Sequence, residues 1–475
     1  MKTACIAILL CSVLAPAQQK ITRDFFALDT NKTSHYRGQQ SPWPDDCCEG
    51  EATPLPFGVW RSLGSQVNWH QIALCEPRNG ADPNDRCYFW DKLDGYLRQV
   101  AAHGEQTLYV VFDTPRFANN GLDTNVPPSD SDGADRYLKE FVTAVYKHAA
   151  SKGWPIKYWE CWNEPDVRNE YQGTPQQLLN MCRDIYETVH ALDPSAQVVS
   201  PPFTSNNGVL GYNSPIDPEN CEGHCSPLQR YLAAGGGKFA DIIGYHGYGF
   251  PDPVDPHFSA TAPPDQLRIN VPHLTATVNT IVAKTGNSGK PIWMTEGACW
   301  YMGGARGAEG PPENDDRRAA CYARYVLQFM GRGTSLVSWF GWDFGGPAEM
   351  LQEHNGRSDD RLNKGGKALW QVYNWTAGRG ATVVEPCTPK GTLYTCTFTD
   401  AKGNTMLVMY DTSQDCDGSP VNCTTTDKTV AAQYKKWTDL EGKTHTITGN
   451  AVPVGRKPIL LEGSAEPAKE PGKKK

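Results

Sequence analysis

Short apolar runs alternate with amphipathic stretches along most of the chain, and this alternation constrains the fold more than any other feature. Runs rich in β-branched and aromatic residues predict strands, at residues 25–28, 57–61, 107–112, 156–162, 196–200, 239–245, 291–295 and 335–344. Apolar residues at helical spacing predict helices over residues 90–103, 137–150, 176–192 and 319–330. Strands separated by helices predict an α/β fold, here a (β/α)8 TIM barrel over residues 18–377.

The pattern changes after residue 378, where helical periodicity ends. Short strand-like runs, separated by Gly, Asp, Asn and Pro, occupy residues 392–398, 405–410, 430–435 and 459–461. Such spacing is typical of an all-β unit, so we expect a small sandwich-like β domain over residues 378–463. The Glu, Lys and Pro residues of 464–475 predict a disordered tail.

The first residues resemble a targeting segment. Lys2 is followed by an apolar run from Ala4 to Leu14 and then by Ala15-Pro16-Ala17. A positive start, a short apolar centre and a small-x-small end predict a signal peptide over residues 1–17. The run is too short to cross a bilayer. We therefore expect a secreted or periplasmic protein with no membrane association after cleavage.

Cysteine usage agrees with export. Two of the sixteen cysteines, Cys5 and Cys11, lie in the expected leader, which leaves fourteen. An even number in an oxidising compartment favours disulfides, and short spacing predicts the pairs 75/87, 221/225, 387/396 and 416/423. Zinc is the alternative for 221–225, where His224 lies between the two cysteines. The sequence indicates no partner for the remaining cysteines, which are Cys47, Cys48, Cys161, Cys182, Cys299 and Cys321.

Charge and motif content exclude several classes of function. The formal net charge is −8, with 45 basic and 53 acidic residues. The chain has no basic stripe, so we expect no nucleic-acid partner. It also lacks a phosphate-binding loop, a His-Glu-x-x-His motif and a Gly-x-Ser-x-Gly motif. We therefore expect no metal and no cofactor.

Two glutamates follow predicted strands. Glu164 comes directly after the fourth strand and Glu296 directly after the seventh. Catalytic residues of a barrel gather where the strands end, and a charged group there is costly to bury without a partner. Two facing carboxylates can cleave a glycosidic bond, one as a proton donor and the other as a nucleophile. The pair predicts a catalytic site, although a single glutamate after a strand is usually a solvated loop residue.

The motifs around these glutamates resemble those of glycoside hydrolase clan A. Trp-Asn-Glu-Pro at 162–165 is similar to the acid/base motif of the clan, and Trp-Met-Thr-Glu-Gly at 293–297 is similar to its nucleophile motif. Within the clan, the chain looks most like family 39 and its bacterial relatives. Trp-Arg-Ser-Leu-Gly at 60–64 and Thr-Pro-Arg-Phe at 114–117 support that similarity, whereas Ser62 stands where a family 39 xylosidase often has histidine.

The resemblance implies a role for each matching residue. Glu164 would be the acid/base and Glu296 the nucleophile. The residues implied to support them or to contact the sugar are Asn163, Arg61, His246, Tyr248, Trp300 and Trp342. The sequence leaves alternatives open: Arg61 could form a structural ion pair with Glu160, His246 could be a strand-end histidine, and the tryptophans could belong to the core.

The sequence therefore predicts a secreted, retaining glycosidase that acts on a carbohydrate substrate by double displacement. Retention requires the two carboxyl groups to lie about 5–5.5 Å apart. Two alternatives are a non-catalytic glycan-binding barrel protein and a transglycosylase with the same residues. The β domain would pack against the barrel or bind carbohydrate, and Trp437 is its only tryptophan.

Overall fold

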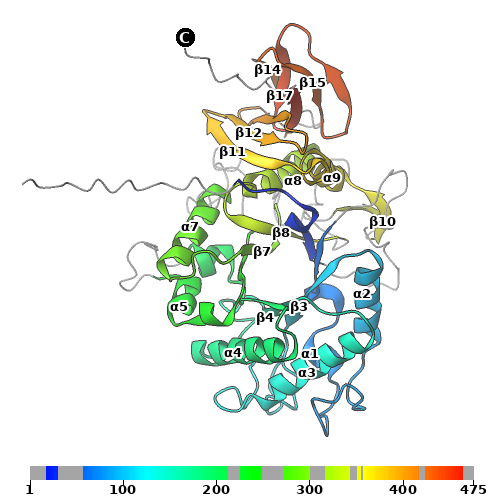
Figure 1. Ribbon diagram of the computed structural model, residues 1–475, viewed down its shortest axis with the longest axis vertical. Helices are drawn as coiled ribbons and strands as arrows, with labels where there is room; N and C mark the ends of the chain where they lie inside the picture. Colours follow the sequence, from blue (N-terminus) through cyan, green and yellow to red (C-terminus); the bar gives the residue numbers. More distant parts are fainter. Residues whose placement is uncertain are drawn as a thin grey trace, which may run out of the picture.

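A computed structural model describes residues 18–29, 57–211, 225–248, 271–299, 316–342, 350–354, 357–414, 416 and 423–463. Figure 1 shows a barrel of strands surrounded by helices, with a smaller β domain stacked beside α8 and α9. The expected signal peptide, the C-terminal tail, Trp300 and Cys221 all lie outside the described residues. Within the described residues, no helix has the length and apolar character needed to cross a membrane.

Eight parallel strands form the barrel. They are β1 (Phe26–Asp29), β2 (Val59–Arg61), β3 (Gln106–Val111), β4 (Tyr158–Cys161), β5 (Gln197–Val199), β6 (Ile243–His246), β7 (Ile292–Gly297) and β8 (Thr334–Phe340). Their order in the sheet is β5-β4-β3-β2-β1-β8-β7-β6. Parallel bridges from Val199 to Ile242 and from Phe203 to Tyr245 close it between β5 and β6. This arrangement confirms the predicted barrel.

Helices pack around the outside of the barrel. They are α1 (Trp69–Ile72), α2 (Asp91–Ala102), α3 (Arg136–Ser151), α4 (Pro175–Leu192), α5 (Pro227–Ala233), α7 (Val271–Lys284), α8 (Asp316–Phe329) and α9 (Lys364–Trp375). The start of α4 is encoded locally, because Thr174 and Gln177 form a capping box and Pro175 occupies the first turn. A hairpin of β9 (Leu351–His354) and β10 (Arg357–Leu362) precedes α9.

The interior of the barrel is built in layers, because alternate residues of a strand point to the same face. One layer is entirely apolar and takes a residue from each strand or its entrance, namely Ala27, Val59, Leu108, Tyr158, Val199, Ile242, Trp293 and Leu336. Two residues further along β1, β2 and β4 stand Asp29, Arg61 and Glu160, all fully buried. On β6 this next position is Gly244, where a Cβ would lie 2.8 Å from the carbonyl oxygen of Ser200. The glycine leaves room for the polar layer.

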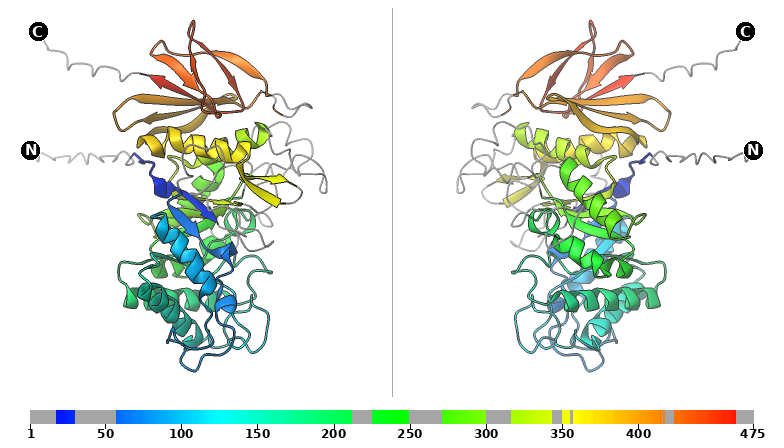
Figure 2. Two further views of the ribbon diagram at one scale, coloured as in Figure 1. Left: turned by 90° about the vertical axis from the view of Figure 1, so that its right-hand side faces the viewer. Right: turned by 90° about the vertical axis from the view of Figure 1, so that its left-hand side faces the viewer.

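The C-terminal domain consists of antiparallel strands. They are β11 (Thr382–Lys390), β12 (Leu393–Thr399), β13 (Thr405–Asp411), β14 (Thr425–Thr429), β15 (Tyr434–Thr438), β16 (Thr444–Thr446), β17 (Ala451–Gly455) and β18 (Ile459–Gly463). Six of them form one sheet, and β14 pairs with β17 in a second sheet. A separate apolar cluster that includes Val452, Val454 and Leu461 lies between these sheets, which confirms the sandwich-like domain. Figure 2 shows this domain stacked on one side of the barrel.

Two predictions for this part of the chain differ from the structure or stay open. The strand expected at 430–435 is wrong in its position: residues 430–433 form the connection between β14 and β15, because strand pairing resumes only at Tyr434. The predicted limit of the barrel at residue 377 stays a prediction. In the structure, α9 ends at Trp375 and β11 begins at Thr382.

Five disulfides lie within the described residues. Cys75–Cys87, Cys387–Cys396 and Cys416–Cys423 were predicted from their spacing and are confirmed. Two further disulfides, which the sequence did not indicate, are Cys161–Cys182 and Cys299–Cys321. The first joins the end of β4 to α4, and the second joins the segment after β7 to α8. Five disulfides suit a protein of an oxidising compartment.

Candidate active site

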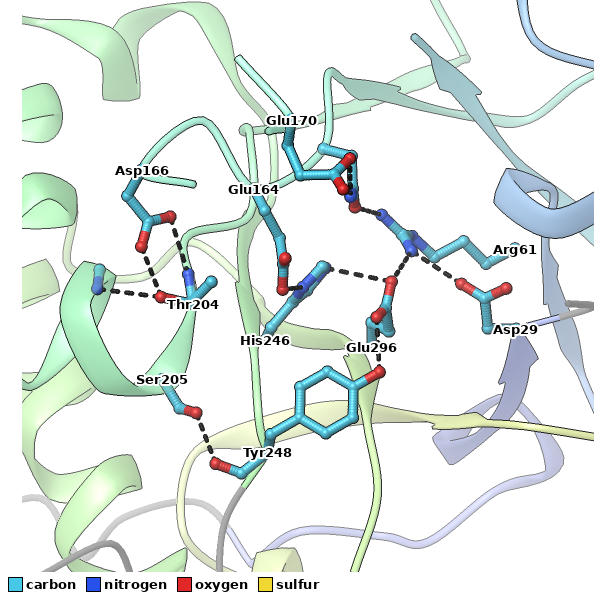
Figure 3. A network of polar contacts seen from close by, with 12 residues as sticks. Asp29, Arg61, Glu164, Asp166, Glu170, Thr204, Ser205, His246, Tyr248 and Glu296 are labelled. Carbon is cyan, nitrogen blue, oxygen red and sulfur yellow. Dashed lines mark hydrogen bonds and ion pairs between the residues drawn. The ribbon is translucent and has the colours of Figure 1, made fainter. Parts of the chain in front are cut away.

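The polar layer of the barrel converges on Arg61, the last residue of β2 (Figure 3). Its Nε donates to Glu160 at 2.6 Å, and its Nη1 donates to Asp29 at 2.7 Å. Nη1 also donates to Oε2 of Glu296 at 2.6 Å, and Nη2 donates to Oδ1 of Asn163 at 2.8 Å. Burial opposes the charge of the guanidinium, but three carboxylates together raise the pKa of Arg61 above its ordinary value. Arg61 therefore forms both contacts that the sequence left open: it supports Glu296, and it forms an ion pair with Glu160.

Three carboxylates around one guanidinium leave an excess of negative charge in a buried place. Burial raises the pKa of Asp29 to about 7; Arg61 counteracts this rise, and the charges of Glu296 and Glu160 add to it. Oδ1 of Asp29 and Oε1 of Glu160 have no hydrogen-bond partner among the described residues. A proton held by Asp29 at neutral pH would reduce this excess charge.

Glu296 is held by a hydrogen bond at each oxygen. Tyr248 donates its hydroxyl to Oε1 at 2.6 Å, while Arg61 donates to Oε2. Burial and the charge of Glu296 raise the pKa of Tyr248 well above its ordinary value, so the phenol stays a donor. These two hydrogen bonds fix the position of the carboxyl group of Glu296. Phe340 of β8 packs edge-on against Tyr248, with ring centroids 5.9 Å apart.

Glu164 has a different environment. It lies three residues beyond β4, and 17% of its side chain is exposed. Burial, followed by the negative charge of Asp166, raises the pKa of Glu164 to about 7, whereas Arg61 lowers it. Nδ1 of His246 lies 2.7 Å from Oε1 of Glu164. Because burial lowers the pKa of His246 to about 4, the imidazole is neutral at pH 7.

His246 stands between the two glutamates (Figure 3). Its Nε2 lies 3.9 Å from Oε2 of Glu296, beyond hydrogen-bond distance. One oxygen of Glu164, one oxygen of Glu296 and one ring nitrogen of His246 all lie within 4.8 Å of one another. The two carboxyl groups therefore face each other at close range in different surroundings: burial and Asp166 favour the acid form of Glu164, whereas Glu296 accepts hydrogen bonds from Arg61 and Tyr248.

This trio is the one group among the described residues with the spacing of a metal site. The guanidinium of Arg61 is 2.6 Å from Glu296, so positive charge already occupies the side of the site where a cation would bind. The donor set is better suited to proton transfer than to holding a divalent cation.

The backbone that carries Glu164 is strained. Glu164 has a φ of 37° and Trp162 a φ of 65°, both in the left-handed region that side chains other than glycine rarely adopt. The indole of Trp162 donates to the carbonyl oxygen of Glu170 at 2.9 Å, which fixes the loop after β4. Such strain persists only where the surroundings enforce it, and it is concentrated at functional sites.

A short connection joins the loops after β4 and β6. Asp166 accepts hydrogen bonds from the backbone N–H of Thr204, at 3.0 Å, and from its hydroxyl group. The hydroxyl of Ser205 donates to the carbonyl oxygen of Tyr248. The π-helical turn Ser205–Val209 thus links the loop of Glu164 to the residue that contacts Glu296.

The structure brings together six of the eight site residues expected from the sequence. Glu164, Glu296, Asn163, Arg61, His246 and Tyr248 form one network. Trp342 follows β8 and has 0% exposure, so it presents no open ring face to a sugar in this structure. Trp69, at the start of α1, is likewise buried and stacks on Phe141 with ring centroids 5.1 Å apart, as a core residue does.

The sequence analysis assigned no role in the site to Asp29, Asp166 or Glu170. Asp29 is the last residue of β1, so a charge at a strand end was a signal for it as it was for Glu164. Asp166 and Glu170 belong to the loop after β4, whose path no local pattern indicates.

No family model matches the sequence, and no curated protein matches it. Solved structures do resemble it. A family 39 glycoside hydrolase from Bacteroides cellulosilyticus WH2 aligns with a TM-score of 0.61 and 15% identity, over 94% of this chain and 81% of its own. The catalytic domain of GH30 xylanase C from Talaromyces cellulolyticus aligns with a TM-score of 0.58 and 13% identity, over 94% and 98%.

A GH39 β-xylosidase from Caulobacter crescentus aligns with a TM-score of 0.55 and 11% identity, over 94% of this chain and 98% of its own. The chain shares the fold of these glycoside hydrolases. The predicted resemblance is thereby confirmed at the level of the fold, and it extends over nearly the whole chain. At such low identity the roles of individual residues rest on the geometry of this site.

Proposed function

We propose that this protein is a secreted, retaining glycoside hydrolase, with Glu164 as acid/base and Glu296 as nucleophile. The observation that carries the proposal is the pair of facing carboxyl groups, with oxygens within 4.8 Å, of which Glu164 has a raised pKa and Glu296 accepts hydrogen bonds from Arg61 and Tyr248. A short separation suits retention, because inversion needs about 6.5–9.5 Å to admit a water molecule. The fold shared with glycoside hydrolases supports the same reaction class.

In the first step, Oε1 or Oε2 of Glu296 attacks the anomeric carbon and forms a covalent glycosyl-enzyme. The bond to the leaving oxygen breaks as Glu164 transfers its proton to that oxygen. The hydrogen bonds from Arg61 and Tyr248 hold Glu296 in place for the attack. In the second step, Glu164 removes a proton from water, the water oxygen attacks the anomeric carbon, and Glu296 leaves as a carboxylate.

Asn163 is oriented for substrate by Arg61. Because Nη2 of Arg61 donates to Oδ1 of Asn163, the amide nitrogen of Asn163 is the group directed away from Arg61. One of its N–H groups donates to Oε2 of Glu170 at 3.4 Å, and the other would donate to the 2-hydroxyl of the sugar, a bond that strengthens in the transition state. The hydrogen bond to His246 would orient Glu164 and leave its second oxygen for the leaving group.

Hydrolysis of a panel of nitrophenyl glycosides and polysaccharides tests the proposal. We expect Glu296→Gln to lower kcat by on the order of 10⁴-fold or more and Glu164→Gln to lower it by about 10²–10⁴-fold. NMR of the first product formed should show the anomer of the substrate. Equal rates in the wild type and both variants would contradict the catalytic proposal and favour a glycan-binding protein. A product with inverted anomeric configuration would exclude Glu296 as nucleophile. Transfer products at high acceptor concentration would identify a transglycosylase.

Secretion is the other part of the proposal. The five disulfides support it, together with the leader-like residues 1–17. N-terminal sequencing of protein recovered from the medium or periplasm should begin near residue 18. Full-length protein that stays inside the cell would contradict it.

A further inference from the structure

A polar pocket of about 460 Å³ opens between the loops that follow β3 and β4. Its lining includes Phe112, Asp113, Arg116, Asp123, Asn169 and Glu170. The volume falls within the range of about 300–1,000 Å³ that is typical of small-molecule sites. None of these residues has a role in the reaction proposed above, so the pocket needs its own explanation.

The pocket adjoins the proposed reaction centre through Glu170. Oε2 of Glu170 accepts a hydrogen bond from Nδ2 of Asn163 at 3.4 Å. Figure 3 shows Glu170 next to Glu164 and the end of Arg61, with its carboxylate turned toward this network. Since Asn163 would donate to the 2-hydroxyl of the cleaved sugar, the pocket lies on the C2 side of that sugar.

The inner wall of the pocket is acidic. Burial raises the pKa of Glu170, and the charges of Glu164, Glu296 and Asp113 add to this effect. Asp113, with a φ of 65°, is held by Nδ2 of Asn68 at 2.9 Å. The ring of His70 also faces it, with Nδ1 3.4 Å from Oδ2 of Asp113.

The one cationic residue among the lining, Arg116, lies at the rim. Its side chain is 73% exposed, and Nη2 lies 3.8 Å from Oδ1 of Asp123, which is 80% exposed. This pair leaves Asp113 and Glu170 as the inner charges. An anion entering the pocket would therefore meet the negative charge of Asp113 and Glu170. The nearby buried cation, Arg61, is already paired with three carboxylates.

The spread of the carboxylates indicates the ligand. Among the described residues, the acidic lining groups do not form a set of three ligand atoms within 4.8 Å, so they are too dispersed for one cation. Separated acceptors match a ligand with several hydroxyl groups, each able to donate one hydrogen bond. Phe112, which packs edge-on against Trp162 at 5.3 Å, adds an apolar surface of the kind that sugar C–H groups contact.

We propose that this pocket is a subsite for a neutral sugar unit carried on O2 of the cleaved sugar, and that it discriminates against uronic acids at the same position. The proposal rests on the proposed function only for the placement of the cleaved sugar beside Asn163. It identifies the substrate class as branched or 2-linked glycans with uncharged substituents.

A binding measurement tests this subsite without requiring turnover. The ligands are 2-O-β-glucosyl-xylose and 2-O-β-glucuronosyl-xylose, which differ only in a CH₂OH or a carboxylate group, together with xylose alone. The same set is prepared on the sugar that the wild type cleaves fastest, if that sugar is not xylose. Binding is measured by NMR titration at low and high salt, using Glu296→Gln as the protein to prevent hydrolysis.

We expect the neutral disaccharide to bind about tenfold more tightly than its uronic-acid counterpart at low salt, with a smaller ratio at high salt. Adding Glu170→Gln or Asp113→Asn should reduce that ratio several-fold. The matched control is Asp427→Asn, which removes one exposed charge from β14 in the C-terminal domain and should leave the ratio unchanged.

Three outcomes would overturn the subsite: equal binding of xylose and the neutral disaccharide, preference for the uronic acid, or the same ratio in Glu170→Gln and in the control. Failure of the proposed function has a separate signature, because it would appear as absence of hydrolysis by the wild type while the neutral disaccharide still binds selectively.

Discussion

The two layers inside the barrel, one apolar and one polar, are built on the same strands, and the polar layer lies two residues further along each strand than the apolar layer. In the apolar layer, residues such as Leu108 and Trp293 fill the interior and leave no charge to compensate. In the polar layer, Arg61 holds Asp29 and Glu160 in full burial. The first layer stabilises the barrel by removing apolar surface from water. The second carries a desolvation cost, which ion pairing offsets only if every partner is present.

The comparison teaches that position along a strand separates stability from chemistry. Moving two residues toward the carboxyl end of β2 replaces Val59 with Arg61, and the same step on β4 replaces Tyr158 with Glu160. Arg61 of the polar layer contacts Glu296, one of the two candidate catalytic groups, whereas the residues of the apolar layer form their own cluster. Substitutions in the two layers should therefore have different pH dependence.

The largest expected effect comes from removing the shared cation. Arg61→Met would leave three buried carboxylates without their partner and should lower the free energy of unfolding by about 3–5 kcal/mol at pH 7. The deficit should shrink at pH 5, because protonation of the carboxylates removes the uncompensated charge. Urea unfolding at both pH values measures it.

Leu108→Ala is the matched substitution in the apolar layer. We expect a loss of about 2–5 kcal/mol that is nearly the same at pH 5 and pH 7, since no charge is involved. A pH-dependent loss in Leu108→Ala, or a pH-independent loss in Arg61→Met, would contradict the distinction between the layers.

A smaller effect is expected from Asp29→Asn. The pKa of Asp29 rises from 3.8 to about 7 on folding, so the native state binds more protons than the unfolded chain between these values. Wild-type stability should therefore fall as the pH rises through this window, and an amide at this position removes that contribution. Relative to wild type, Asp29→Asn should gain about 1–3 kcal/mol between pH 4 and pH 8. Parallel stability curves for the two proteins would show that Asp29 does not titrate there.

The smallest effect concerns Glu164, the proposed general acid, which lies outside both layers. The charge of Asp166 raises the pKa of Glu164, so Asp166→Asn should lower it. Because the proposed general acid must be protonated, the basic limb of the kcat/KM profile should move to lower pH by less than about one unit. Asp427→Asn serves as the control. A shift to higher pH, or an equal shift in the control, would show that the charge of Asp166 does not raise the pKa of Glu164.

Much of the barrel could be predicted because its signals are local. The apolar run before Glu164 and the one that contains Trp293 both predicted strands, and both strands lie in the barrel. The residues after these runs then had to meet at one end of the barrel, since parallel strands end together. This geometry placed Glu164 and Glu296 together without any knowledge of the loops.

The features that the sequence did not predict depend on contacts between distant segments. The Cys161–Cys182 and Cys299–Cys321 disulfides each close a strand onto the next helix, and their separations of 21 and 22 residues carry no spacing signal. The link from Asp166 to Thr204 likewise joins two loops. Trp342, expected as an aromatic platform, is buried in the structure because the same large side chain serves a core as well as a ligand.

These two disulfides have a practical consequence for anyone who produces the protein. Each lies immediately beside a segment that bears one of the paired glutamates, and all four sulfur-bearing side chains are buried. Synthesis in a reducing cytoplasm would yield chains without these two disulfides. The end of β4 would not be crosslinked to α4, nor the segment after β7 to α8, and each missing crosslink would cost about 2–4 kcal/mol of stability. A preparation of this kind should be less stable than the oxidised protein, and mild reductant added to the oxidised protein would have little access to the buried sulfurs.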